Sequence, residues 1–591
     1  MVVPKRYVRV SVVLLLLLGV IWLLDFFLGK QHALLISNSS EKFMMSITLE
    51  DPADYDPVKV RQALRSLPPD RNLVVSVGVI TCFYVGTFWE YCPGFYKYKE
   101  GEPNKALADK TDLKIIKKDL KRTRSLRLVG ASHYFMYETV SVSKAIEHFP
   151  DSSETLFALC DFNNLDMKVA DGTVLPSNMF YFSMVAEQSI QDWKFVCDVD
   201  IFFGPGAVDP RSGWSLSADV ALKIGPTTKH ISLKRPIAIG EPSDSPRLHV
   251  GPRNTFKIVQ LADLHFSVGN GHCRDEFPQH EECQADPKTL TFIEQVLDSE
   301  KPQLVVFTGD QIMGQECYLD SASALLKVVK PVIDRKIPYA MVWGNHDDEG
   351  SLNRWQLSEL ARSLPHSIFQ IGDKDTNDNT FGVGNYAHHI YDQNENPVSA
   401  LYFLDAHKYS PNAKAYPGYD WIKEKQWDYF NRYEDNFPEQ TKSLSMAFFH
   451  IPLPEYLNFQ SKHAPDSQNP MVGNAKEGIT APKYNSQGLK TLSRLGVKVV
   501  TTGHDHCNDF CLLDDSLSPA NEDKIWLCFG GAAGEGGYAG YGGTERRIRI
   551  FELDYTANTI MTWKVLNSSP TVPFDRQTLV SDGIPKTDSL A

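Results

Sequence analysis

The stretch "PYAMVWGNHD", Pro338 to Asp347, decides the fold class, because an apolar strand ends in it and a turn of polar residues follows at once. Two earlier segments have the same form, "TFKIVQLAD" at 255–263 and "QLVVFTGD" at 303–310. Helical patterns at 286–300 and 321–336 separate the three strands. Strands that alternate with helices in this way are typical of an α/β domain with a parallel sheet, and we predict that class here.

The residues that follow the predicted strands carry ligand groups. Binding sites in such sheets lie beyond the carboxyl ends of the strands, and two later apolar strands end in "FFHIP" and "TTGHDH". The candidate metal ligands are Asp263, His265, Asp310, Asn345, His450, His504 and His506. Residues i and i+2 of an extended segment face the same way, so each D-x-H or H-x-H pair can face one cavity.

The chemistry of these side chains indicates a metal centre. They offer oxygen and imidazole donors and no thiolate, a set that suits Mn, Zn or Fe. Seven ligands are too many for one ion, and they suit two ions that share a carboxylate and act on phosphorus. A lone D-x-H, a Gly-Asp turn or His450 by itself has an ordinary structural explanation. Together and in this order, each at the end of an apolar strand, they favour a ligand set.

The blocks D-x-H, GD, GNHD, a single H and GHDH resemble the signature of the calcineurin-like metallophosphoesterase superfamily. The segments "AFFHIPLPEY" and "GITAPKYNSQGLKTL" resemble the plant purple-acid-phosphatase-like proteins and the fungal dosage-dependent cell-cycle regulator phosphatases. The similarity covers about residues 255–553. It implies a four-layer αββα metallophosphoesterase sandwich, preceded here by a β-rich domain and an N-terminal membrane anchor.

The resemblance also implies a role for each candidate residue. The first metal would be held by Asp263, His265, Asp310 and His506, and the second by Asn345, His450 and His504, with Asp310 as the bridge. His346 would be the catalytic acid, and a metal-bound hydroxide would attack phosphorus. The expected cofactors are two divalent or mixed-valence metal ions, Mn, Zn or Fe.

One position departs from the true purple acid phosphatases, which place a Tyr three residues after the bridging Asp. This chain has Met313 there, and it has His265, which those enzymes lack. We therefore expect no tyrosinate-to-iron colour. The alternative is that another tyrosine, such as Tyr318, reaches the site.

The expected function is that of a metal-dependent phosphatase acting on phosphomonoesters, with phosphoproteins favoured by the resemblance. One alternative is a phosphodiesterase acting on nucleotides or lipid headgroups, because the same metal pair serves both reactions. Another is a binding protein with a relic metal site, which the presence of every expected ligand disfavours. His407 and Arg546 are candidate substrate contacts, and the loop at 530–543, which is no P-loop, is either a flexible loop or a wall of the site.

Composition limits the class of protein. The chain has 591 residues, too many for one core, and a net charge of −13. Acidic proteins are poor non-specific ligands of nucleic acid, so we expect no nucleic-acid partner. The basic run at 110–127 has apolar residues at helical spacing, and we interpret it as an amphipathic surface helix.

The N-terminus predicts a membrane anchor. Lys5, Arg6 and Arg9 precede an apolar run that extends, with one interruption at Asp25, to Leu28. That run is just long enough to cross a hydrocarbon core of about 30 Å. A cleaved signal peptide is the alternative, but no small-x-small site follows. We expect a single-pass protein of the endomembrane system whose catalytic domain is lumenal, in the vacuole or the endoplasmic reticulum.

We expect four regions: an anchor at 1–37, a β-rich domain of unknown role at 38–240, a metallophosphoesterase domain at 241–570 and a C-terminal tail at 571–591. A Pro- and Gly-rich linker is expected at 233–254. Cysteines occur in close pairs, 82 with 92, 273 with 283 and 507 with 511. Local disulfides in an oxidising compartment fit that spacing, and buried thiols are the alternative. Sequons at Asn38 and Asn567 would be usable in a lumen.

Overall fold

The structure is a computed structural model of the full chain. It describes residues 65–86, 89–91, 112–121, 129–148, 196–222, 227–234, 246–280, 282–372, 381–434, 443–459, 472–517, 523–539 and 543–586. The predicted anchor at 1–37 lies outside these residues. Among the residues that are described, no helix is both long enough and apolar enough to cross a membrane.

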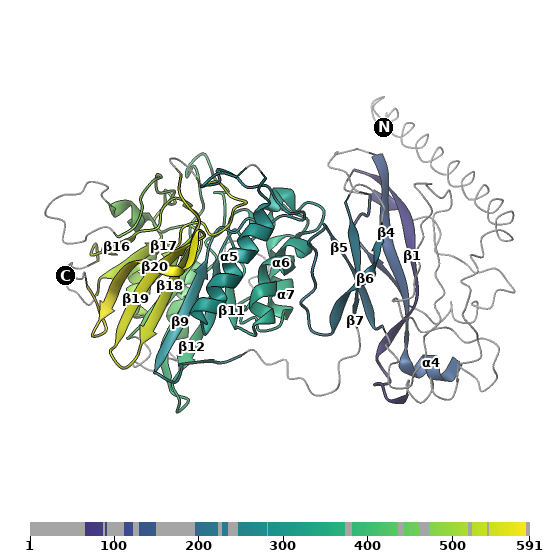
Figure 1. Ribbon diagram of the computed structural model, residues 1–591, viewed down its shortest axis with the longest axis horizontal. Coiled ribbons are helices and arrows are strands. Elements are labelled where there is room, and N and C mark those ends of the chain that lie inside the picture. Colours follow the sequence, from purple (N-terminus) through teal and green to yellow (C-terminus); the bar gives the residue numbers. More distant parts are fainter. Residues whose placement is uncertain are drawn as a thin grey trace, which may run out of the picture. The chain divides into compact units, whose positions relative to one another are not determined.

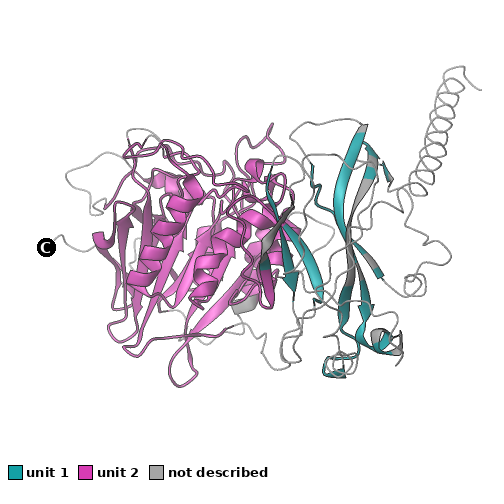
Figure 2. Cartoon of the chain, turned by 45° about the vertical axis from the view of Figure 1, so that its right-hand side comes forward, with its two compact units in different colours: residues 1–201, 216–236 teal, residues 202–215, 237–591 magenta. Residues whose placement is uncertain are grey.

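The chain forms two compact units (Figure 2), and each is considered by itself. Unit 1 contains residues 1–201 and 216–236, and unit 2 contains residues 202–215 and 237–591. The boundary near 236–237 lies within the predicted linker. That linker is not free of structure, because its last part supplies strand β8 (Leu248–His249), which pairs with a strand of unit 2.

The described part of unit 1 is rich in strands, as the alternating sequence predicts. Four of them form an antiparallel sheet in the order β2-β1-β4-β3: β1 (Asn72–Val85), β2 (Trp89–Tyr91), β3 (Asp112–Ile116) and β4 (Val129–Ser141). Helix α4 (Val142–His148) follows β4 directly. A second sheet has the order β5-β7-β6: β5 (Asp198–Phe203), β6 (Trp214–Leu222) and β7 (Lys229–Lys234).

The prediction of an amphipathic helix at 110–127 is wrong. Residues 112–116 form strand β3, which pairs with β4 in register from Asp112 opposite Thr139 to Ile116 opposite Phe135. The apolar residues of that stretch are too few to separate a helical period from the period of a strand. Pairing with the long strand β4 decided the outcome, since it satisfies the backbone hydrogen bonds of the segment.

Unit 2 contains two seven-stranded sheets. The first has the order β11-β10-β9-β18-β19-β20-β21, with β9, β10 and β11 parallel and the others antiparallel. Its strands are β9 (Thr255–Leu261), β10 (Leu304–Thr308), β11 (Tyr339–Val342), β18 (Arg547–Asp554), β19 (Thr559–Leu566), β20 (Ser569–Ser581) and β21 (Ile584–Pro585). The prediction of a C-terminal tail from residue 571 is wrong for the residues up to Pro585, because β20 and β21 belong to this sheet.

The second sheet has the order β16-β17-β15-β14-β13-β12-β8. Its further strands are β12 (Tyr386–Tyr391), β13 (Pro397–Phe403), β14 (Ser445–Phe448), β15 (Val497–Thr502), β16 (Cys511–Asp514) and β17 (Ile525–Phe529). Strands β13, β14, β15 and β17 are parallel to one another. Their carboxyl ends therefore emerge at one edge of the sheet.

The two sheets contact each other face to face. Tyr386 of β12 bonds the backbone of Met341 in β11, with oxygen-to-oxygen and oxygen-to-nitrogen distances of 2.8 and 3.1 Å. Gln260 of β9 accepts a hydrogen bond from Thr501 of β15 at 2.6 Å, in the same interior. Buried polar groups require such partners, so these bonds fix how the sheets face each other.

Helices cover the outer faces and complete four layers (Figure 1). Beside the first sheet lie α5 (Ala285–Glu300), α6 (Ser321–Asp334) and α7 (Arg354–Ser363). Beside the second lie α8 (Glu424–Glu434), α9 (Gly488–Arg494) and the short helix η6 (Pro454–Asn458). Two further short helices, η3 (Gly314–Glu316) and η4 (Asp347–Glu349), lie in loops of the candidate site. The mixed α/β fold predicted from sequence is confirmed.

Two disulfides lie in unit 2. Cys273 pairs with Cys283, which is close to it in sequence, and so gives one local disulfide of the kind expected. Cys511 on β16 lies opposite Cys528 on β17 and bonds to it, whereas its sequence neighbour Cys507 has a free thiol. Cys82 is also disulfide-bonded, and Cys92 lies outside the described residues.

The segment 202–215 leaves the β-rich sheet and packs within unit 2. The backbone N–H of Phe203 donates to Ser323 Oγ on helix α6 at 2.8 Å, and both groups are buried. Beside them, Arg211 forms a bidentate pair with Asp209 and covers the ring of Trp214 at 3.9 Å. Unit 2 therefore includes a segment that lies well before residue 241, where the second large domain was expected to begin.

We predict that Ser323→Ala lowers the free energy of unfolding by about 1–3 kcal/mol, because it removes a buried hydrogen bond to the Phe203 amide. Denaturant unfolding measures the loss, and hydrogen exchange should show reduced protection at Phe203. Ser363→Ala, at an exposed hydroxyl on α7, is the matched control. Equal stability of the two variants would contradict the assignment of this contact.

Candidate metal centre

The candidate ligands follow the carboxyl ends of five strands, three from the first sheet of unit 2 and two from the second. Asp263 and His265 follow β9, Asp310 follows β10 and Asn345 follows β11. From the second sheet, His450 follows β14, and His504 and His506 follow β15. All seven side chains are buried, and none has more than 7% of its surface exposed. The structure therefore brings every ligand predicted from sequence into one place.

Four of these residues form a first subsite. Ligand atoms of Asp263, His265, Asp310 and His506 all lie within 4.8 Å of one another. The Nε2 atoms of His265 and His506 are 3.2 Å apart. Asp310 Oδ2 lies 3.7 Å from His265 Nε2, and Asp263 Oδ1 lies 3.5 Å from His506 Nε2. Two imidazoles and two carboxylates thus face one point.

The other three residues form a second subsite beside the first. His450 Nε2 lies 3.2 Å from Asn345 Oδ1 and 3.2 Å from His504 Nδ1. It also lies 3.4 Å from Asp310 Oδ2, the oxygen atom that reaches His265 in the first subsite. Asp310 is therefore placed between the two groups, as a shared carboxylate would be.

The spacing of these atoms fits metal binding. Donors held about 2.0–2.2 Å from one ion at tetrahedral or octahedral angles lie about 2.8–3.6 Å apart. The nitrogen–nitrogen and nitrogen–oxygen distances of 3.2 to 3.7 Å in both subsites agree with that range. Nitrogen lone pairs repel one another at such distances unless a cation lies between them. The donor set and its geometry thus suit a pair of metal ions.

Backbone carbonyls orient two of the imidazoles. His450 Nδ1 donates to Thr308 O at 2.9 Å, and His506 Nδ1 donates to Tyr538 O at 2.6 Å. A proton on Nδ1 leaves Nε2 as the ligand atom, and in both residues Nε2 faces the cluster. Such hydrogen bonds to the far nitrogen fix the tautomer and the ring plane of a metal-binding histidine.

The glycine before each ligand of GD, GNHD and GHDH makes room for a ligand from another loop. A Cβ on Gly309 would lie 2.2 Å from His450 Nδ1, and one on Gly344 would lie 2.2 Å from Asp310 Oδ1. A Cβ on Gly503 would lie 2.8 Å from Asp263 Oδ2. Real Cβ atoms do not approach so closely, so the motif needs glycine because the loops converge.

The backbone at the ligands differs from the extended form that the sequence suggested. Asp263, His265 and Asp310 have φ values of 54°, 52° and 51°, and His504 has a φ of 77°, all in the left-handed region. Non-glycine residues rarely adopt it, and such strain gathers at functional sites. Asp263 and His265 do face one cavity, as predicted, but strand alternation is not the reason, because β9 ends at Leu261.

Asp347 holds two ligand loops together. Its carboxylate accepts hydrogen bonds from the backbone N–H groups of Asp310, Ile312 and Gly344 at 3.1, 3.1 and 2.7 Å. Burial and, to a smaller extent, the nearby carboxylate of Asp310 together raise the pKa of Asp347 to about 7. The last residue of GNHD is thus a structural link between loops.

His346 stands at the edge of the cluster. Its Nδ1 donates to Glu349 Oε2 at 2.8 Å, and its backbone N–H donates to Asp310 Oδ1 at 2.9 Å. Its ring centroid lies 5.6 Å from that of His265, and 26% of its side chain is exposed. Nε2 is therefore the free ring nitrogen of a histidine that borders the ligands. Sequence reasoning gave Glu349 no role, although it stands three residues after His346, a spacing that permits this contact.

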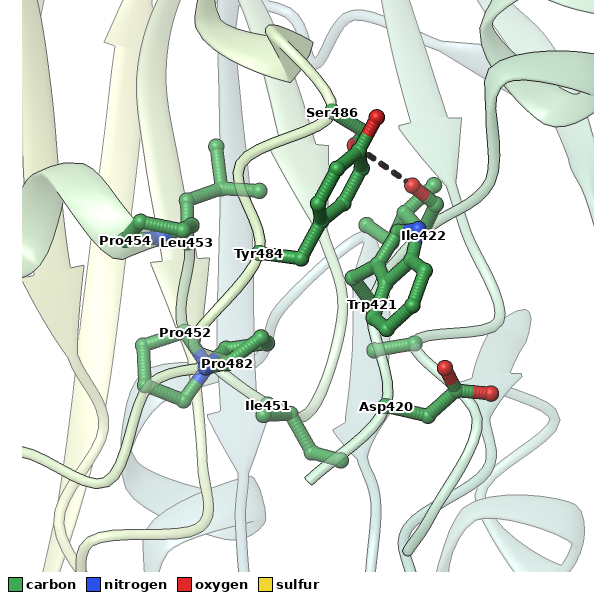
Figure 3. Close-up of a pocket in the computed structure, with 11 residues that line it drawn as sticks. Asp420, Trp421, Ile422, Ile451, Pro452, Leu453, Pro454, Pro482, Tyr484 and Ser486 are labelled. Atoms are coloured by element: carbon green, nitrogen blue, oxygen red, sulfur yellow. Dashed lines mark hydrogen bonds between the residues drawn. The ribbon is translucent and has the colours of Figure 1, made fainter. Parts of the chain in front are cut away.

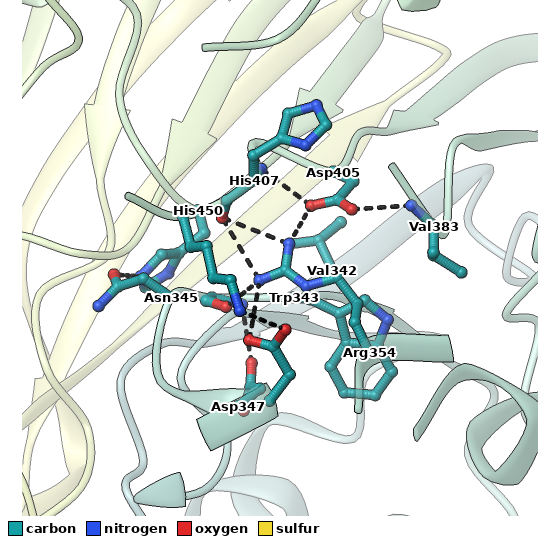
Figure 4. Close-up of polar contacts among 12 residues, drawn as sticks. Val342, Trp343, Asn345, Asp347, Arg354, Val383, Asp405, His407 and His450 are labelled. Atoms are coloured by element: carbon teal, nitrogen blue, oxygen red, sulfur yellow. Dashed lines mark hydrogen bonds and ion pairs between the residues drawn. The ribbon is translucent and has the colours of Figure 1, made fainter. Parts of the chain in front are cut away.

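Arg354 supports the same loop from α7 (Figure 4). Its guanidinium donates to Gly344 O and to the Asp405 carboxylate, and more weakly to His407 O at 3.3 Å. Asp405 also accepts from the backbone N–H of Val383 at 2.8 Å. The predicted substrate contact at His407 is wrong, since that side chain is buried and its Nε2 is 2.7 Å from Gln426 Oε1.

Arg546 is not a substrate contact either. Its side chain is 2% exposed, pairs with Glu535 at 3.2 Å and donates to three backbone carbonyls, those of Arg274, Gly537 and Tyr538. It therefore holds the glycine-rich loop in place from beneath. The sequence shows Arg546 only as a neighbour of the glycine-rich loop. The fold shows in addition that carbonyls of this loop point toward its guanidinium.

The described part of the glycine-rich loop, 530–539, is packed and lies behind the first subsite. The Ala533 N–H donates to Ala262 O at 3.0 Å, and the Gly534 N–H donates to Asp263 O at 3.3 Å. A Cβ on Gly537 would lie 2.5 Å from His265 Cδ2 and 2.6 Å from His506 Cε1. The expectation of a flexible loop is wrong for these residues, because glycine here allows backbone to touch the ligand rings.

A cavity near the centre does not belong to it (Figure 3). It is lined by eleven residues, among them Trp421, Ile451, Pro452 and Tyr484, and no candidate ligand lies in its wall. Ser486 Oγ donates a hydrogen bond to Ile422 O at 2.6 Å in the upper part of the cavity.

Met313 occupies the position at which the true purple acid phosphatases have a tyrosine. Its side chain is buried, and its backbone N–H donates to Phe266 O at 2.8 Å.

The family is shown by comparison with known proteins. The model of the calcineurin-like phosphoesterase family matches residues 256–508, which include all seven candidate ligands and His346. The chain is 48% identical to phosphatase DCR2 of Saccharomyces cerevisiae over 533 residues, 89% of this chain and 90% of that protein. The chain belongs to the calcineurin-like phosphoesterase family. Within it, the chain is a close homologue of a yeast phosphatase.

A plant relative is more distant. The chain is 34% identical to the probable inactive purple acid phosphatase 29 of Arabidopsis thaliana, over 56% of this chain and 88% of that protein. The resemblance predicted from sequence, to both the fungal and the plant groups, is confirmed.

We predict that Gly537→Ala weakens the first subsite without unfolding the protein, because the added methyl group displaces the rings of His265 and His506. Metal analysis after gel filtration should show loss of about one ion per chain. Gly478→Ala is the control, because a Cβ there meets nothing within 4 Å. Full metal content in Gly537→Ala would show that the rings adjust.

We also predict that metal binding releases a proton. Burial opposes charge on His450, but Asp310 and Asp263 outweigh it and raise its pKa to about 9. In chelator-treated protein His450 is therefore protonated at neutral pH, and an ion must displace that proton. The apparent affinity for Zn or Mn should rise about tenfold per pH unit between pH 6.5 and 8.5 and level off near pH 9. Calorimetric titration in two buffers of different ionisation enthalpy measures the proton, and an affinity independent of pH would contradict this.

Proposed function

We propose that this protein is a metal-dependent phosphatase that hydrolyses phosphomonoesters at a two-metal site. The observation that carries the proposal is the position of Asp310, whose Oδ2 reaches both His265 and His450 and so joins two ligand groups into one centre. Two ions bound there would lower the pKa of water and neutralise charge on a phosphoryl group. Family membership and the yeast phosphatase homologue support the class of reaction.

The chain's own residues would divide the remaining work. Asp263, His265, Asp310 and His506 would hold one ion, and Asn345, His450 and His504 the other. His346 would give a proton to the leaving oxygen from Nε2, because Glu349 holds its Nδ1. Asp347 and Arg354 would keep the loops of Asp310 and Asn345 in register, so that the donors meet at a fixed distance.

We further propose phosphoproteins as the substrate class and a lumenal site of action. The first rests on the sequence resemblance to the fungal dosage-dependent cell-cycle regulator phosphatases. The second rests on the apolar N-terminus and on two disulfides, Cys273–Cys283 and Cys511–Cys528, which form in oxidising compartments. The sequon at Asn567 lies in the turn between β19 and β20, where its amide donates to Glu535 Oε1 at 3.0 Å.

The test compares Asp310→Asn and His346→Ala with the wild-type chain. We expect Asp310→Asn to lose both ions and all hydrolysis of p-nitrophenyl phosphate, because it removes the shared charge. His346→Ala should keep both ions and lose about 10²–10⁴-fold in kcat. His249→Ala, at an exposed histidine on β8, is the control. Turnover retained in Asp310→Asn would overturn the proposal.

The substrate of the same assay distinguishes the alternatives. Hydrolysis of bis(p-nitrophenyl) phosphate in preference to the monoester would favour a phosphodiesterase. Binding of two ions without any hydrolysis that His346→Ala abolishes would favour a relic site in a binding protein. The chain retains all seven expected ligands within one cluster, which supports an active centre.

A further inference from the structure

Among the described residues, few large side chains beside the candidate metal centre are exposed. The seven candidate ligands are almost completely buried, so a substrate can approach only past partly exposed neighbours. Among the residues that the structure describes, His346 and Glu349 form one such edge, with 26% and 23% of their side chains exposed. Tyr409 and Tyr538 are exposed to 50% and 38%, which is unusual for side chains of this size.

Tyr409 lies on the side of the second subsite. Its hydroxyl faces the side chain of Asn345. Its ring stacks on Tyr419, with centroids 5.4 Å apart and planes inclined by 22°. Tyr419 in turn packs edge-on against His504 at 4.3 Å. A backbone bridge between the two tyrosines, and bonds from Ser410 N to Gly418 O and from Asp420 N to Lys408 O, close this loop as a hairpin.

Tyr538 lies on the side of the first subsite. Its ring stacks flat on His506, with centroids 3.9 Å apart and planes inclined by 9°. Its hydroxyl donates to Glu477 Oε2 at 2.8 Å, and Glu477 Oε1 accepts from Cys507 N at 2.5 Å. The ring is therefore held at both ends. One face covers a ligand, and the exposed part belongs to the other face.

The two rings share one property that packing alone does not require. Tyr538 stacks directly on a candidate ligand, Tyr409 stacks on a ring that contacts one, and each tyrosine has a substantial exposed area. Other large side chains that are exposed in the described residues, such as Leu457 and Val572, have no such contact with the ligands. Fixed aromatic rings beside a reaction centre are suited to stack planar groups, and a ring that is already immobilised loses little entropy on binding.

We propose that Tyr409 and Tyr538 form a leaving-group subsite that selects phosphomonoesters of aromatic alcohols, phosphotyrosine among them, over those of aliphatic alcohols. The inference rests on the proposed function and names its substrate class. The phosphoryl group would occupy the metal centre, and the aryl ring would lie against an exposed tyrosine face. Stacking geometry, with centroids about 4.5–7 Å apart, would provide the selectivity.

The test uses binding, so that it does not depend on catalysis. Phenylphosphonate and cyclohexylphosphonate carry the same charge and six carbon atoms each, and only one is aromatic. Calorimetry on the metal-loaded full chain should show tighter binding of the phenyl compound. Tyr409→Leu and Tyr538→Leu should each reduce the ratio of the two affinities about 3- to 10-fold. Tyr409→Phe and Tyr538→Phe keep the ring and should keep the ratio.

Phe277→Leu is the matched control, because Phe277 is an equally exposed ring (51%) that packs over Gly543. It should leave the ratio unchanged. A ratio near one in the wild type, or equal weakening of both ligands by the Leu variants, would overturn the subsite. Hydrolysis assays separate the two proposals. If the chain hydrolyses phosphomonoesters but the Leu variants leave the affinity ratio unchanged, only the subsite is refuted. If the affinity ratio depends on the tyrosines but the chain hydrolyses no phosphomonoester, only the phosphatase function is refuted.

Discussion

The structure depends on one constraint, the convergence of buried oxygen and nitrogen donors on Asp310. Carboxylates and imidazoles that lie 3.2 to 3.7 Å apart in a buried site are costly, because burial removes them from water. Burial and the neighbouring histidines lower the pKa of His265 and His504 well below the usual value, so both are neutral, the form that binds metal. Such a cluster of donors could bind metal, and the rest of the fold holds these donors in place.

The scaffold meets this constraint by bringing loops from two sheets to one edge. Strands β9, β10 and β11 supply one half of the donors, and β14 and β15 supply the other. Hydrogen bonds between the sheets, such as that from Thr501 to Gln260, fix the halves relative to each other. The left-handed backbone at Asp263 and Asp310 is strained, and it persists because Asp347 and the packed glycine-rich loop restrain the same turns.

Outside the ligands, sequence reasoning failed where a side chain has two plausible directions. His407 follows a strand as the ligands do, yet its ring turns to Gln426 in the interior. Arg546 stands next to a glycine-rich loop, which in sequence looks like the rim of a site, yet its guanidinium satisfies carbonyls beneath that loop. Cys507 is close to Cys511 along the chain, but strand register places Cys528 opposite Cys511. Sequence distance does not reveal such choices.

The sequence by itself determined the α/β fold class and predicted the seven candidate ligands and His346, because an apolar strand that ends in Gly-Asp or Gly-Asn-His leaves few alternatives for those residues. A local motif predicts the place of its residues well when it directly follows a strand, because it must then lie at the carboxyl end of that strand. Only the tertiary structure decided that Glu349 pairs with His346, that Arg354 supports Gly344, and that two tyrosines border the mouth. These are contacts of loops whose paths depend on packing, and no period or spacing in the chain encodes where such loops meet.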